Sequence, residues 1–124
     1  MTPSRRAAVI AMSLMLAAPA AAQPAQVVIR VWSFGFAPNP IRLAAGRPVT
    51  LTFVNRSNSG HDFTARTFFA YSRILSGAAP EGKIGMGPGQ SRSITLVPSR
   101  GTYQAHCSHF LHKQLGMSDM IIVE

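Results

Sequence analysis

Beyond residue 22, apolar and polar residues alternate with a period of two, which is the pattern of β-strands. The clearest run is 49–54, where a valine, a leucine and a phenylalanine alternate with threonines. Similar short runs, bounded by turn residues, occupy 27–32, 41–44, 90–97, 102–107 and 119–123. Strands do not alternate with long helical patterns, which disfavours a parallel α/β sheet. The spacing predicts an all-β fold, a Greek-key β-sandwich of six to eight strands.

The middle of the chain departs from this alternation. Residues 61–69 are expected to be extended, and residues 70–75 to form one or two helical turns. Residues 77–89 hold five glycines and two prolines, which favours a loop with little regular structure. We therefore expect a short helical or irregular insertion around residues 70–89.

The first 22 residues have the three parts of a secretory signal peptide. Arg5 and Arg6 precede an apolar run over 7–18, and small residues end at Ala22. The apolar run is shorter than the roughly 20 residues that span a bilayer. We therefore expect a signal peptide over 1–22 and one mature domain over 23–124. That domain would be periplasmic or secreted, with no membrane span after cleavage.

Composition and charge then limit the partners. The chain carries 12 Lys and Arg against 4 Asp and Glu, a formal charge of +8, which becomes +6 once Arg5 and Arg6 are removed. Only 13% of the residues are charged and 47% are hydrophobic, as in a folded domain. Because an exported protein rarely meets nucleic acid, the charge favours an acidic protein partner and no nucleic acid. We expect a monomer.

The only cysteine, Cys107, lies in a segment rich in metal ligands. A single cysteine excludes an intramolecular disulfide and a four-cysteine zinc site. The segment 101–117 also holds three of the four histidines and Met117. The fourth histidine, His61, follows the 49–54 strand. A thiolate, two imidazoles and a weak thioether are a ligand set that suits copper.

The order of these residues resembles the cupredoxin family, the small blue-copper proteins such as plastocyanin and azurin. The segment GTYQAHC ends at Cys107, where the spacing Cys107-x4-His112-x4-Met117 begins, and the closing strand MIIVE comes after it. Earlier in the chain, VTLTFVN precedes His61. The resemblance implies one copper per chain, cycling between Cu(I) and Cu(II). It implies His61, Cys107 and His112 as ligands and Met117 as the weak axial ligand. It also implies a one-electron carrier with a transient redox partner, and not an enzyme.

Two departures from the family pattern leave alternatives open. Asp62 stands where the family often has asparagine, and its carboxylate is expected to accept a hydrogen bond from Ser108 or a backbone N–H. The loop lacks the usual proline and glycine, so His109 is a rival to Met117 for completing the site. The alternative function is a periplasmic copper-binding protein for copper delivery, storage or tolerance, with a copper-exchange partner.

Neighbouring residues are expected to have structural or docking roles. His106 should face away from the metal, because successive side chains of a strand point to opposite faces. Three residues near His112 are either core or, as the resemblance implies, a docking patch: Phe110, Leu111 and Leu115. Three aromatic residues are expected to pack in the core or at an edge: Trp32, Phe34 and Phe36. A cysteine nucleophile is disfavoured, since no orienting residue is evident beside a histidine base.

Overall fold

The fold was analysed in a computed structural model that describes residues 2–4, 6–13, 23–109 and 111–124. Residues 2–4 and 6–13 have no regular secondary structure. The predicted signal peptide falls partly outside the described residues, and so does its cleavage site at Ala22, so this boundary remains a prediction. Within the described ranges, no helix has both the length and the apolar character needed to cross a membrane.

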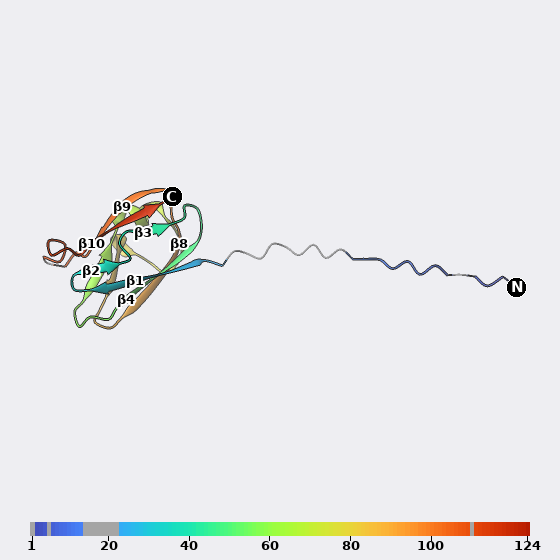
Figure 1. The fold of residues 1–124 in the computed structure, drawn as a ribbon, viewed down its shortest axis with the longest axis horizontal. Helices are drawn as coiled ribbons and strands as arrows, with labels where there is room; N and C mark the ends of the chain where they lie inside the picture. Colours follow the sequence, from blue (N-terminus) through green and yellow to red (C-terminus); the bar gives the residue numbers. More distant parts are fainter. Residues whose placement is uncertain (1, 5, 14–22, 110) are drawn as a thin grey trace.

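Two five-stranded sheets form a β-sandwich (Figure 1), which confirms the all-β prediction. The first sheet has the order β2 (Gly35–Ala37), β1 (Ala25–Trp32), β4 (Val49–Asn55), β8 (Ser91–Val97) and β6 (Arg73–Ser76). The second has the order β3 (Ile41–Leu43), β10 (Ser118–Val123), β9 (Gly101–His106), β5 (His61–Thr64) and β7 (Lys83–Met86). β1 pairs with β4 and β3 pairs with β10 in parallel, so neighbours in the sheets come from distant parts of the chain.

The alternation in β4 shows why these residues form strands. Val49, Leu51 and Phe53 are buried, while the threonines between them face outward. Thr50 Oγ1 lies 2.8 Å from Thr95 Oγ1 of β8, and the next outward pair is joined in the same way. One face of the strand therefore fills the core, and the other is satisfied by cross-strand hydrogen bonds.

The segment between residues 61 and 89 is more regular than the sequence indicated. The described residues form ten strands and not six to eight, because β2, β6 and β7 are short strands in segments read as turn, helix or loop. The helix α1 spans Arg66–Tyr71, so it begins four residues before the helical turns expected at 70–75, and the expected loop over 77–89 holds the three-residue 3₁₀ turn η1 (Pro80–Gly82) as well as β7. α1 buries the consecutive Phe68 and Phe69, and β7 is held by its pairing with β5 despite its glycine. Tertiary packing has overridden local propensity here.

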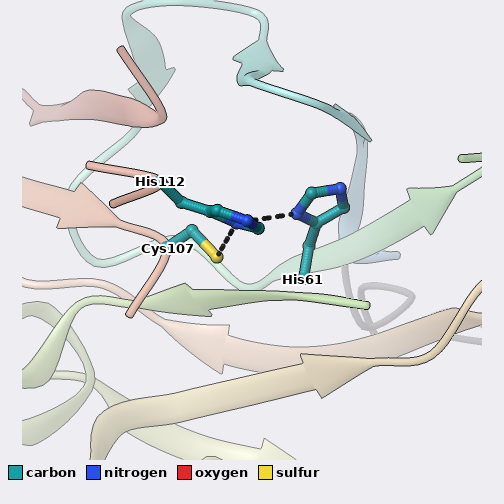
Figure 2. A group of neighbouring side chains, drawn as sticks. All are labelled: His61, Cys107 and His112. Carbon is teal, nitrogen blue, oxygen red and sulfur yellow. Dashed lines mark hydrogen bonds between the residues drawn. The ribbon is translucent and has the colours of Figure 1, made fainter. Parts of the chain in front are cut away.

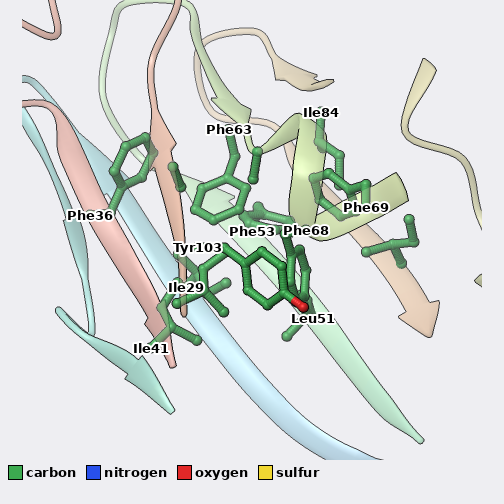
Figure 3. Close-up of a cluster of buried hydrophobic side chains, with 14 of the residues drawn as sticks. Ile29, Phe36, Ile41, Leu51, Phe53, Phe63, Phe68, Phe69, Ile84 and Tyr103 are labelled. Atoms are coloured by element: carbon green, nitrogen blue, oxygen red, sulfur yellow. The ribbon is translucent and has the colours of Figure 1, made fainter. Parts of the chain in front are cut away.

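An aromatic cluster in the core fixes β5 in place (Figure 3). The ring of Phe63 in β5 lies 4.7 Å from that of Phe53 and 5.3 Å from that of Phe36, measured between centroids. These contacts join the two sheets, and Phe69 of α1 packs edge-on against Phe63 from another side. Each buried ring contributes about 1.5–3 kcal/mol of burial free energy. Because His61 is only two residues from Phe63, the cluster also anchors one side of the functional site.

Candidate metal centre

Three residues predicted as metal ligands meet at one end of the sandwich (Figure 2). His61 begins β5, Cys107 directly follows β9, and His112 lies in the loop between β9 and β10. One possible ligand atom from each lies within 4.8 Å of the other two. His112 Nδ1 is 3.3 Å from His61 Nδ1 and 3.4 Å from Cys107 Sγ. His61, which is 46 positions before Cys107 and 51 before His112, therefore joins them to present two imidazoles and a thiol to one point.

The pairing of β9 with β10 shapes the loop that carries His112. The backbone N–H of Cys107 donates to the carbonyl of Met117 at 3.0 Å, and that of Met117 donates to the carbonyl of His112 at 2.9 Å. Gly116 has a φ of +93°, a conformation that glycine adopts without strain. Met117 is fully buried at the end of this loop, and its role as axial ligand remains a prediction.

The imidazole of His61 is held by a contact that the sequence did not reveal. His61 is 1% exposed, and its Nε2 lies 3.0 Å from Ser33 Oγ, in the turn between β1 and β2. This contact leaves Nδ1 facing His112. Burial lowers the pKa of His61, and the imidazoles of His112 and His109 lower it further. The ring is therefore neutral near pH 7, as metal binding requires.

Cys107 is a buried thiol, with 1% of its surface exposed. Burial raises the pKa of this thiol, and a hydrogen bond from the backbone N–H of Asp62 to Sγ, at 3.4 Å, acts in the opposite direction. The metal-free side chain is thus protonated near neutral pH. Binding of a metal ion to this sulfur would release the proton.

Asp62 ties β5 to the loop after Cys107. Its carboxylate accepts hydrogen bonds from the backbone N–H of Ser108 at 2.9 Å, from the Ser108 hydroxyl at 2.6 Å and from the Thr64 hydroxyl at 2.6 Å. Burial would raise the pKa of Asp62, but these hydrogen bonds outweigh it and hold the pKa below its usual value. The expected contact between Asp62 and Ser108 is present. The contact with Thr64 was not predicted, although Thr64 lies two residues after Asp62 and therefore on the same face of β5.

His109 belongs to a second group of possible ligands. Its ring stacks on that of His112 at 5.2 Å, and its Nε2 lies 3.5 Å from Asp62 Oδ2. Asp62, Cys107 and His109 each offer an atom within 4.8 Å of the other two. Asp62 already accepts three hydrogen bonds, so this group is less free to bind a metal. His106 is in neither of the two groups found among the described residues, and its direction away from the metal remains a prediction.

Three apolar residues near His112 are exposed. Leu111 and Leu115 are 49% and 57% exposed, so neither is a core residue. Phe34 is 41% exposed and packs edge-on against the His112 ring, with 5.1 Å between centroids. Phe110 lies outside the described residues. Of the three aromatic residues expected in the core or at an edge, only Phe36 is buried.

Comparisons with known proteins agree with this architecture. A family model described as "Cupredoxin-like domain" matches residues 5–123. Auracyanin B is 23% identical, with 84% of this chain and 92% of that chain covered and a TM-score of 0.59. The auracyanin of Roseiflexus castenholzii is 21% identical (83% and 99% covered, TM-score 0.60).

Auracyanin A of Chloroflexus aurantiacus, whose structure is described as that of a "blue" copper protein, is 17% identical. That comparison covers 82% of this chain and 100% of the other, with a TM-score of 0.60. At these identities, the likeness establishes the fold alone. No curated protein sequence matches the chain significantly.

Proposed function

The chain belongs to the cupredoxin-like domain family, and we propose that it is a one-electron carrier with one copper ion per chain. The observation that carries this proposal is the convergence of His61, Cys107 and His112, with ligand atoms within 4.8 Å of one another. The auracyanins with the same fold include one described as a "blue" copper protein, which supports the choice of metal.

The donor set fits copper better than the alternatives. One thiolate, two imidazoles and a buried thioether from Met117 are a soft and borderline combination typical of electron-transfer copper sites, whereas a structural zinc site would need more thiolates or imidazoles. When bound, copper supplies a reversible Cu(I)/Cu(II) couple. The chain contributes a site whose ligands are already close together. Little rearrangement between oxidation states is then needed, which favours fast electron transfer.

Each side chain has a distinct part in this mechanism. His61 and Cys107 are buried and fixed by strands, with Ser33 holding the imidazole and Asp62 holding the loop after Cys107. His112 is only partly buried, and it connects the interior of the site to the surface. The exposed Leu111 and Leu115 give a partner an apolar contact beside it. Such a protein turns over no substrate and is not an enzyme by itself.

The setting that we propose is outside the cytoplasm. The features of residues 1–22 support export and cleavage after Ala22, and a mature domain of 23–124 that is periplasmic or secreted. The formal charge of +6 on that domain supports a transient, acidic redox partner. We propose that the mature domain is a monomer.

Copper delivery is a second candidate function, favoured by one observation. His109, with Cys107 and Asp62, forms a group of possible ligands beside the first. An ion leaving His61 and His112 would meet this histidine near the surface, since 45% of its side chain is exposed. A colourless protein that binds Cu(I) alone and passes it to a second protein would support delivery over electron transfer.

The visible and paramagnetic spectra of the Cu(II)-loaded mature protein test the proposal. A thiolate–copper bond gives an intense visible charge-transfer band, and this band should vanish in Cys107→Ser. Ser91→Ala, an exposed change on β8, is the matched control and should leave the spectrum intact. Absence of the band in the wild-type protein, or its survival in Cys107→Ser, would contradict the proposed site.

A further inference from the structure

A groove of about 420 Å³ lies on the first sheet, away from the candidate ligands. Its lining combines apolar and cationic side chains from β1 and from the end of β4: Val28, Arg30, Val31, Trp32, Val54 and Arg56. Val28 and Trp32 are 56% and 42% exposed. Large apolar side chains that stay exposed beside arginines are typical of protein-binding surfaces.

The strand register explains how these side chains gather. β1 and β4 are parallel, with Arg30 opposite Val54 and Val31 opposite Asn55. Alternation along β1 puts Val28, Arg30 and Trp32 on the outer face, and Arg56 lies two residues beyond Val54. Both arginines therefore lie among apolar side chains, and Trp32, the last residue of β1, marks one end of the groove.

The charged residues of the groove and of the first sheet are all basic. None of the four acidic residues of the chain lies in the first sheet, whereas this sheet also carries Arg73 and Arg92. Asp62 and Asp119 are buried in the second sheet. In the described part of the chain, the one Arg–carboxylate pair is between Arg42 and Glu124, so Arg30 and Arg56 have no carboxylate partner within 4.0 Å.

The indole end of the groove is connected to the metal centre. Trp32 is followed by Ser33, whose hydroxyl contacts His61 Nε2 at 3.0 Å. The indole packs over Gly35, where an added Cβ would lie 2.7 Å from the ring, so the backbone of β2 supports the indole from one side. The groove is therefore linked to a candidate ligand through the consecutive residues Trp32 and Ser33.

We infer that this groove binds a carboxylate-bearing segment of an acidic partner protein. The guanidinium groups of Arg30 and Arg56 match carboxylates in geometry and charge, and each can bind one through two parallel hydrogen bonds. Val28, Val54 and Trp32 would receive the apolar parts of the same segment. That the partner exchanges electrons rests on the proposed function, whereas the binding itself does not depend on copper.

The chain provides a reporter at the right position, because Trp32 is its only tryptophan. A capped hexaglutamate peptide is titrated into the metal-free mature protein while the fluorescence of Trp32 is followed. We compare Arg30→Gln/Arg56→Gln with the matched control Arg47→Gln/Arg100→Gln. The control removes the same charge from exposed loops that meet through the hydrogen bond from Gly46 N–H to the Pro98 carbonyl.

The fluorescence should change saturably and return as salt is added. Removing both groove arginines should weaken peptide binding by about tenfold or more, and the control pair should change it by no more than about twofold. Sulfate at the same ionic strength should not reproduce the change. The copper spectrum of the groove variant should equal that of the wild type, so loss of copper binding and loss of peptide binding are separate results.

Three outcomes would overturn the inference. Equal weakening by the two double variants would mean that only net charge matters. A fluorescence response as large with sulfate as with the peptide would indicate a general anion site. Saturable binding of anionic phospholipid vesicles in place of the peptide would assign the groove to a membrane surface.

Discussion

Ser33 and His61 are 28 residues apart in the chain, yet the Ser33 hydroxyl lies 3.0 Å from Nε2 of the imidazole. The contact joins the turn after β1 in the first sheet to the start of β5 in the second. Because Nε2 is engaged in this way, Nδ1 is the nitrogen that faces His112 and Cys107. Such contacts fix the tautomer and the direction of a ligating histidine.

Ser33→Ala should therefore weaken copper binding without unfolding the protein. Loss of a hydrogen bond to a ligating histidine typically reduces metal affinity by about 10–100-fold. We expect a decrease near the lower end of that range, with a visible band shifted in position, measured by competition with a copper chelator. Ser91→Ala should leave the affinity unchanged. An unaltered affinity in Ser33→Ala would mean that the core holds His61 unaided.

Asp62→Ala should disturb the site more than Ser33→Ala. The change removes the acceptor of two hydrogen bonds from Ser108 and one from Thr64, and so frees the loop that follows Cys107. We expect lower copper affinity and a broadened or shifted visible band. Asp62→Asn keeps an oxygen acceptor and should retain most of the wild-type behaviour. If copper affinity and spectrum are the same in Asp62→Ala, the carboxylate has no part in ordering the site.

The sequence indicated three residues that the structure brings together, whereas it missed three of the strands around them. Cys107, His112 and Met117 are close in the chain, so their spacing already indicated a ligand loop, and His61 follows the most regular strand. Ser33 gave no local indication, because its contact with His61 arises only from the packing of the two sheets. Ligand spacing is a local property, whereas such contacts depend on tertiary structure.

The strands missed between residues 70 and 89 have a related cause. β6 and β7 have four residues each, and β7 contains a glycine that reads as a loop residue. They exist because β8 and β5 provide partners for them. Strand propensity is too weak to reveal such edge strands without those partners.

Replacing His109 and His112 separately should distinguish the two candidate functions. Electron transfer predicts that His112→Ala removes the intense visible band, because a ligand is lost, while His109→Ala leaves the band and the reduction potential nearly unchanged. Delivery predicts instead that His109→Ala slows the transfer of Cu(I) to a competing chelator, measured by stopped flow. A His109→Ala protein without the band would show that His109 is a principal ligand, in contradiction of the proposed set.

Asp119 gives the fold a pH dependence that does not require copper. The residue is 6% exposed, its Oδ1 accepts a hydrogen bond from the Met120 N–H, and its Oδ2 has no partner in the described part of the chain. Burial raises the pKa of this carboxyl from 3.8 to about 6. The folded state therefore binds more protons than the unfolded state between these values, and stability falls as the pH rises through this range.

Asp119→Asn should consequently stabilise the metal-free protein at pH 7.5. A pKa shift of this size corresponds to about 3 kcal/mol of lost stability when the carboxyl is ionised, and the substitution removes this loss. Burying an amide with incomplete hydrogen bonding cancels part of the gain. We expect a net gain of about 1–2 kcal/mol at pH 7.5 that shrinks as the pH approaches 4.5, measured by urea unfolding. Glu124→Gln, which changes an exposed carboxylate, should show no comparable trend. A difference between Asp119→Asn and the wild type that is constant with pH would show that the carboxyl titrates normally in the folded protein.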